Sequence, residues 1–244
     1  MRVAPSVLTI QGLPIHLIPD YAQWLRERVA EGHGMHVVTL NAEMVMQAVR
    51  NPRLKTVIQQ AELVVPDGVG VTLYLQLRRC GTYHAPGIDL VGQVLAHLRQ
   101  ETVFFLGGAP GVAARAAHYW QQQNPALQVA GVQHGYFTPE EESRIVAQLR
   151  QQQPRLMLVA LGVPRQEFWI QRHRHLCPQS VWVGVGGSFD IWAGEKVRAP
   201  LWIRRLYLEW AFRLYQEPWR WRRMLALPQF AVRVLLPALW GGGG

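Results

Sequence analysis

Residues 102–123 read TVFFLGGAPGVAARAAHYWQQQ, and this stretch decides the fold class. A short apolar run comes first, glycines follow at Gly107, Gly108 and Gly111, and an Ala- and Gln-rich run completes it. A continuous apolar run bounded by glycines is typical of a strand buried on both faces, and the following run is typical of a helix. The stretch therefore predicts one strand–turn–helix unit.

The same strand-then-helix order recurs along the first 196 residues. Residues 3–17 predict a β-hairpin that turns at Gly12-Leu13-Pro14. Strands alternating with helices of about ten residues indicate βαβ units, so we expect an α/β fold with a mostly parallel sheet flanked by helices. Strands are predicted at 35–40, 62–65, 102–106, 129–133, 156–161 and 181–185, and helices at 21–30, 42–50, 69–78, 112–123, 139–151 and 167–176.

The composition favours a globular protein with an anionic partner. The chain has 244 residues, of which 49% are hydrophobic and 17% charged, which suits one α/β domain with an appendage. A net charge of +9 indicates nucleic acid, anionic lipid or a phosphorylated substrate as partner. Cys80 and Cys177 form no CxxC pair, which favours a reducing compartment. We find neither a signal peptide nor an apolar run of about 18 to 20 residues, so we expect any membrane contact to be made from the surface.

From residue 197 the composition changes and predicts a basic helical appendage. From Arg198 onward there are eight Arg, no Lys, five Trp and only two acidic residues. Helices are predicted at 200–215, 218–225 and 229–236. We therefore expect a core at 1–196, an appendage at 197–240 and a Gly tail at 241–244.

The Arg- and Trp-rich composition of the appendage favours a lipid interface, in which Arg meets lipid phosphates and Trp lies at the headgroup level. Packing against the core is the second interpretation, and nucleic-acid binding through phosphate contacts and stacking is the third. Exposed apolar surface can also serve a second copy of the chain, so a homo-oligomer is left open.

Distinctive residues follow the predicted strands, at the edge where an open parallel sheet binds its ligands. Asp67, in VVPDGVG, can act there as a general base or can be the N-cap of a helix. Gln166 can hydrogen-bond the hydroxyl groups of a sugar, or simply lie at a helix start, and Thr39 and Asn41 can be ligands, caps or turn formers. The other candidates at this edge are Gly107, Gly108, Gly111, Tyr136, Phe137, Gly162, Pro164, Gly186, Gly187 and Asp190.

The glycine loops are compatible with phosphate binding without being specific for it. FFLGGAPG and VGVGGSFD would let the backbone approach a phosphate at a helix N-terminus, but a plain turn is the stronger interpretation of each alone. Neither loop matches GxGxxG or a Walker loop, which argues against a dinucleotide-dependent oxidoreductase. The nine His show no metal-ligand spacing and the chain has no DxD pair, so we predict no metal site.

Seven sequence blocks together resemble a known family. They are TLNAEMV, VVPDGVGV, FFLGGAPG, HGYFTPEE, VALGVPRQE, GVGGSFDIWAGEKVRAP and LEWAFRLYQEPWR, in this order between about residues 8 and 225. They are similar to the WecG/TagA/CpsF family of bacterial glycosyltransferases. The resemblance implies a Rossmann-like core that moves a sugar of the ManNAc, ManNAcA or glucose type from a UDP-sugar to a polyprenyl-diphosphate-linked saccharide. It further implies inversion at the sugar carbon, no metal or other cofactor, and a product used for cell-surface polysaccharide or teichoic acid.

The resemblance also implies roles for individual residues. Asp67 would be the catalytic base, with Thr39, Asn41 and Gln166 near it in the pocket. The appendage would complete the active site and dock on the anionic inner face of the bacterial plasma membrane, with no nucleic acid as partner. Its candidates for contact with the lipid-linked acceptor or the membrane are Arg198, Arg204, Arg205, Arg213 and Arg220.

One position departs from the family pattern. Many members carry an Arg shortly before G-x-D-L, but here the segment is YHAPGIDL, with His84 near that place. A His could handle a phosphate there only when protonated. The departure leaves one alternative open, a non-catalytic basic protein on the same fold that binds nucleic acid or a membrane.

Overall fold

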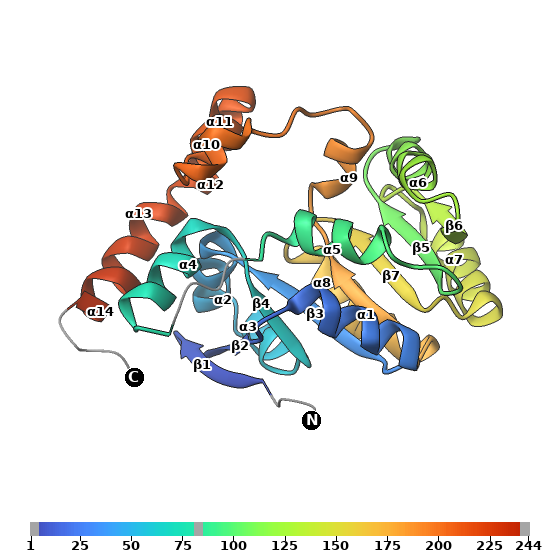
Figure 1. The fold of residues 1–244 in the computed structure, drawn as a ribbon, viewed down its shortest axis with the longest axis horizontal. Helices are drawn as coiled ribbons and strands as arrows, with labels where there is room; N and C mark the ends of the chain where they lie inside the picture. The colour runs from blue at the N-terminus through green and yellow to red at the C-terminus, as the bar shows by residue number, and fades with distance from the viewer. Residues whose placement is uncertain (1–4, 81–84, 240–244) are drawn as a thin grey trace.

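The computed structural model describes residues 5–80 and 85–239, and its centre is a six-stranded parallel sheet with the strand order β4-β3-β8-β7-β5-β6 (Figure 1). Each predicted strand of this sheet is confirmed to within one residue. The α/β prediction is therefore correct. The strands are β3 (Met35–Leu40), β4 (Leu63–Pro66), β5 (Thr102–Gly107), β6 (Gln128–Gln133), β7 (Leu156–Ala160) and β8 (Val181–Gly184).

Helices cover both faces of the sheet, which explains why its strands are apolar without alternation. In β5, Val103 and Phe105 join one buried cluster, whereas Phe104 and Leu106 join another on the opposite face. One face packs against α1 (Tyr21–Glu31), α5 (Gly87–Leu95), α6 (Val112–Gln123) and α9 (Ser188–Trp192). The other face packs against α2 (Ala42–Arg50), α3 (Pro52–Gln59), α4 (Gly68–Leu77), α7 (Pro139–Gln152) and α8 (Arg165–His173).

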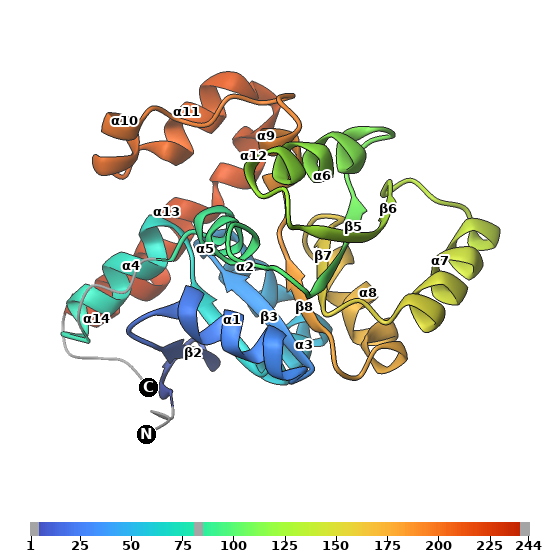
Figure 2. The same ribbon diagram turned by 45° about the vertical axis from the view of Figure 1, so that its right-hand side comes forward.

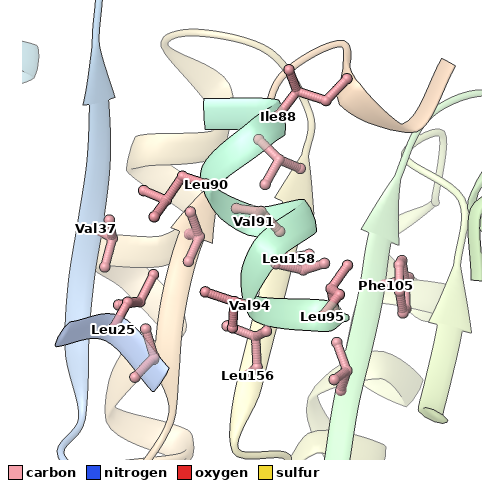
Figure 3. Packing of buried hydrophobic residues seen from close by; sticks show 14 of the residues in the cluster. Leu25, Val37, Ile88, Leu90, Val91, Val94, Leu95, Phe105, Leu156 and Leu158 are labelled. Carbon is pink, nitrogen blue, oxygen red and sulfur yellow. The ribbon is translucent and has the colours of Figure 1, made fainter. Parts of the chain in front are cut away.

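Helix α5 lies across the strands of the first face, where its apolar side chains fill the core (Figure 3). Val91, Val94 and Leu95 are fully buried there with Leu158 of β7 and Phe105 of β5. This helix was not predicted from the sequence, because it begins after Pro86 without a polar cap. It also missed α3, although Asn51 caps that helix and Pro52 opens it.

The predicted hairpin is present as β1 (Ser6–Ile10) and β2 (Leu13–Leu17), which form a separate antiparallel sheet. Its turn lies one residue earlier than predicted, at Gln11 and Gly12, and both have positive φ angles of 50° and 75°. Two positive φ angles give a turn whose twist matches that of the flanking strands. Thr138 caps α7, because its side chain accepts a hydrogen bond from the backbone N–H of Glu141 in a capping box.

The appendage is helical but more broken than predicted. The single helix expected at 200–215 is wrong: α10 and α11 are separated by residues 206–208, where Tyr207 has a φ of 60°. No described helix is both long and apolar enough to cross a bilayer. The elements are α10 (Leu201–Arg205), α11 (Glu209–Gln216), η2 (Pro218–Arg220), α12 (Trp221–Met224), α13 (Ala226–Phe230), η3 (Ala231–Leu235) and α14 (Leu236–Leu239).

The last part of the appendage is buried against the core. Phe230 and Val234 are almost fully buried beside α2 and α4. Helices α10, α11 and α12 bury no residue completely and stand apart from the sheet, whereas α13 and α14 run beside α4 (Figures 1 and 2). The division at residue 196 stays a prediction, and the Gly tail lies outside the described residues.

Candidate active site

A cavity of about 720 Å³ lies between the carboxyl ends of β4, β3 and β8 and the appendage. The strand ends contribute Thr39, Asn41 and Asp67, and the loop after β8 contributes Gly186 and Gly187. The N-terminus of α5 and the start of α8 form further parts of its wall. From the appendage come Arg198, Arg204, Arg205, Tyr207, Glu209, Trp210, Arg213, Arg223, Met224 and Leu227.

Some of the predicted site residues line the cavity, and the others lie outside its lining. Thr39, Asn41, Asp67, Gln166, Gly186, Gly187, Arg198, Arg204, Arg205 and Arg213 line it. The strand order explains part of this division, because β5 and β6, which precede the predicted residues between Gly107 and Phe137, lie on the far side of the sheet from β4. The predicted residues outside its lining are Gly107, Gly108, Gly111, Tyr136, Phe137, Gly162, Pro164, Asp190 and Arg220.

Several residues of the second group have structural partners. A Cβ at Gly107 would lie 2.3 Å from the carbonyl oxygen of Ala160, so this glycine permits the close approach of β5 to β7. Asp190 accepts a hydrogen bond from Lys196 at 2.6 Å, and Arg220 pairs with Glu217 at 2.7 Å. The part of these residues in ligand binding stays a prediction.

Asp67 lies at the start of α4, in the N-cap position, but its side chain does not cap that helix. Its carboxylate instead accepts hydrogen bonds from the backbone N–H groups of Gly87 and Gly68. Burial raises the pKa of Asp67 to about 6, Glu209 raises it further, and Arg213 opposes the shift. Such a carboxylate is ionised at neutral pH and is a stronger base than an ordinary Asp.

Thr39 and Asn41 are fixed on either side of the end of β3. The Thr39 hydroxyl donates a hydrogen bond to the carbonyl oxygen of Gly184 in β8 at 3.2 Å. Asn41 caps α2, because its side-chain oxygen accepts a hydrogen bond from the backbone N–H of Met44 at 3.0 Å. The prediction that Asn41 caps a helix is confirmed. Capping uses only the carbonyl oxygen of its amide, and the residue also lines the cavity.

Gln166 is held at both ends of its amide. Its Oε1 accepts a hydrogen bond from the backbone N–H of Gly186 at 3.2 Å, and its Nε2 donates one to Glu167 at 2.8 Å. Gln166 is 2% exposed and Glu167 is 0% exposed. Burial raises the pKa of Glu167 to about 7. Gln166 and Glu167 lie in the first turn of α8, so the helix start predicted at Gln166 is confirmed.

The arginines of the cavity differ in how far carboxylates already neutralise them. Arg198 forms two hydrogen bonds of 2.5 and 2.6 Å with the carboxylate of Asp89. Arg213 pairs with Glu209 at 2.9 Å, and Arg223 pairs with Glu43 at 2.7 Å.

Two arginines of the cavity make weaker ion pairs with carboxylates, or none. Arg204 lies 4.0 Å from Asp89, which Arg198 already occupies. Arg205 has no ion pair with any described carboxylate. Arg204 and Arg205 are therefore the guanidinium groups most available to an anion.

Sequence reasoning missed several residues of this cavity, among them Gly87, Asp89, Glu209 and Arg223. Asp89 and Glu209 stand in the blocks YHAPGIDL and LEWAFRLYQEPWR, so the family pattern carried a signal for them. Nothing in the pattern indicated which arginine each would face. His84 lies outside the described residues.

No group of three His, Cys, Asp or Glu side chains within residues 5–80 and 85–239 is placed to hold a metal ion. Positive charge near the cavity comes from its arginines.

Comparison with known proteins identifies the family. Residues 8–242 match the Glycosyl transferase WecG/TagA/CpsF family. A protein of Bacillus spizizenii named N-acetylglucosaminyldiphosphoundecaprenol N-acetyl-beta-D-mannosaminyltransferase is 38% identical over 208 residues, which cover 84% of this chain and 80% of that protein. Proteins with the same name from Bacillus subtilis and Staphylococcus aureus are each 33% identical over 205 residues, or 83% of this chain and 79% and 80% of theirs. The chain therefore belongs to the WecG/TagA/CpsF family of glycosyl transferases, and it is a glycosyltransferase.

Proposed function

We propose that this glycosyltransferase moves an N-acetylmannosamine-type sugar from its UDP-linked donor to a GlcNAc-diphosphate-polyprenol, with inversion and without a metal. The names of the relatives support the sugar and the acceptor. The observation that carries the chemistry is the position of Asp67, which lines a cavity walled on its other side by appendage arginines.

Asp67 would act as the general base of a single displacement. Its ionised carboxylate takes the proton of the acceptor hydroxyl as that oxygen attacks the sugar carbon, and UDP leaves from the opposite face. One carboxylate suffices, because an inverting transfer needs no covalent intermediate. The backbone N–H groups of Gly87 and Gly68 orient the carboxylate for this step.

The leaving diphosphate would be stabilised by arginine. Hydrogen bonds from guanidinium groups to phosphate oxygens are strong and short, and they gain strength as negative charge develops on the leaving group. Arg204 and Arg205 are the candidates with the least competition from carboxylates, and Arg213 would join them if it left Glu209. The active site is then complete only when the appendage is present.

The appendage would also bring the enzyme to its lipid-linked acceptor at the inner face of the plasma membrane. Trp202 is 63% exposed, Trp219 is 71% exposed and Trp221 is 54% exposed, and arginines lie between them in the sequence. Exposed Trp beside Arg suits the boundary between anionic headgroups and acyl chains. The same side chains suit contact between two copies of the chain. Liposome flotation tests the membrane contact, and light scattering tests the contact between copies.

The test is release of UDP by the purified protein. It is incubated with a short-chain prenyl-diphosphate-GlcNAc acceptor and a panel of UDP-sugars, in parallel reactions with and without EDTA. We expect release that depends on the acceptor and is fastest with UDP-N-acetylmannosamine. Release abolished by EDTA and restored by Mg²⁺ would refute metal independence. Failure to bind or turn over any UDP-sugar would refute the proposed donor and favour a non-catalytic role.

A further inference from the structure

A buried carboxyl group lies directly behind the cavity wall, and the chemistry proposed above does not use it. Glu167 is fully buried in the first turn of α8. Its Oε1 accepts a hydrogen bond from Gln166 at 2.8 Å, and its Oε2 has no hydrogen-bond partner among the described residues. A buried carboxyl group with one partner costs stability, so packing alone does not account for it.

The surroundings of Glu167 determine which way the Gln166 amide points. The backbone N–H of Gly186 can only donate, so it requires the amide oxygen of Gln166 on its side. Glu167 then faces the amide nitrogen. One hydrogen of that nitrogen is used by Glu167, and the second remains for another acceptor.

The end of β8 is shaped for this arrangement. A Cβ at Gly184 would lie 2.4 Å from Nε2 of Gln166 and 3.0 Å from Oε1 of Glu167, so the missing side chain makes room for both. The carbonyl oxygen of the same glycine accepts the hydrogen bond of Thr39. Two polar residues of the cavity wall are thus positioned against one strand end.

We propose that Glu167 is a positioning residue that holds the Gln166 amide so that its second N–H donates to an acceptor oxygen of the bound substrate. That oxygen belongs to a sugar hydroxyl or a phosphate group. Glu167 itself does not touch the substrate. The donation to the substrate rests on the proposed transfer reaction, whereas the hold of Glu167 on the Gln166 amide does not.

The first test observes the amide directly and needs no substrate. Glu167→Gln keeps an acceptor oxygen, whereas Glu167→Met keeps a similar volume without one. The side-chain amide signals of Gln166 are identified in ¹⁵N–¹H spectra by their loss in Gln166→Leu. We expect slow hydrogen exchange in the wild type and in Glu167→Gln, and exchange at least about tenfold faster in Glu167→Met. Unchanged slow exchange in Glu167→Met would overturn the proposal.

A second variant covers the case in which Glu167→Met does not fold. Gly184→Ala crowds Nε2 of Gln166 with its added Cβ at 2.4 Å and retains the carboxyl group of Glu167, whose Oε1 would lie 3.0 Å from that Cβ. If the backbone spectrum of Glu167→Met is not that of the wild type, we expect the faster exchange in Gly184→Ala instead. Exchange as slow as in the wild type there would also overturn the proposal.

The kinetic test asks whether Glu167 acts through Gln166. We expect Glu167→Met to lower kcat/KM about tenfold, the loss of one hydrogen bond, and Glu167→Gln to restore most of it. In a Gln166→Ala background, Glu167→Met should have no further effect. An equal loss in both backgrounds would show that Glu167 acts independently of Gln166 and would refute the proposal. If the wild type transfers none of the sugars offered, the proposed function fails while the exchange measurement still decides the role of Glu167.

Discussion

The pH dependence of transfer should report the pKa of Asp67. Its carboxyl titrates near 6 instead of 3.8, because burial disfavours its charged form. The general base must be ionised, so kcat/KM should rise with pH through this value and level off above it. Near pH 5 roughly a tenth of the base would be ionised, whereas an ordinary Asp would remain almost fully ionised. We therefore expect roughly a tenfold loss of kcat/KM between pH 7 and pH 5.

The charged neighbours of Asp67 predict the direction in which a substitution should shift the pH profile. Glu209 raises the pKa of Asp67, so Glu209→Gln should move the midpoint of the profile to lower pH. Glu195→Gln is the matched control, because that exposed carboxylate pairs with Arg115 and does not line the cavity. The assay is UDP release at substrate concentrations below KM, which reports the free enzyme. A wild-type profile that stays flat down to pH 4.5 would refute Asp67 as the base.

Four further outcomes follow from the contacts described. Asp67→Asn should lower kcat about 10²- to 10⁴-fold with an unchanged melting temperature, and wild-type turnover would contradict its role. Phe230→Ala should cost about 3–5 kcal/mol of unfolding free energy, measured by urea denaturation, because this buried ring packs against α2 and α4. Asp89→Asn removes the charge-assisted pair with Arg198, so the chain after Arg198 should become more sensitive to limited proteolysis. Sensitivity equal to that of the wild type would argue against a role of this ion pair in holding the appendage. Trp219→Ser should weaken flotation with anionic liposomes, and unchanged flotation would place the membrane contact elsewhere.

The sequence predicted the sheet well because burial on both faces leaves a clear record in apolar runs such as the one in β7. It predicted helices less well where the local signal was weak, as in α5, which has no polar cap. The break at Tyr207 was missed because the helical pattern of apolar residues continues through it. An element could therefore be predicted where its own residues carried a clear signal, such as an apolar run or a polar cap.

For the candidate site, the sequence predicted which residues end strands but not which strand ends are neighbours. Asp67 and Gln166 were found because the carboxyl edge of a parallel sheet is a general place for ligands. The glycine loop after β5 was grouped with them, although the strand order places it beyond β7. The pairing of Arg198 with Asp89, 109 residues apart, depends on the tertiary fold and could not be predicted from local sequence.

Contacts that join the appendage to the core include the ion pair of Arg198 with Asp89, the ion pair of Arg223 with Glu43 and the buried ring of Phe230. The chain between them behaves as a closed loop, and the entropy of closing a loop grows only slowly with its length, by about 0.6 kcal/mol for each doubling. Insertions or deletions between these points should therefore cost the fold little. The length of this stretch can therefore change while the sheet and the carboxylate of Asp67 keep their positions.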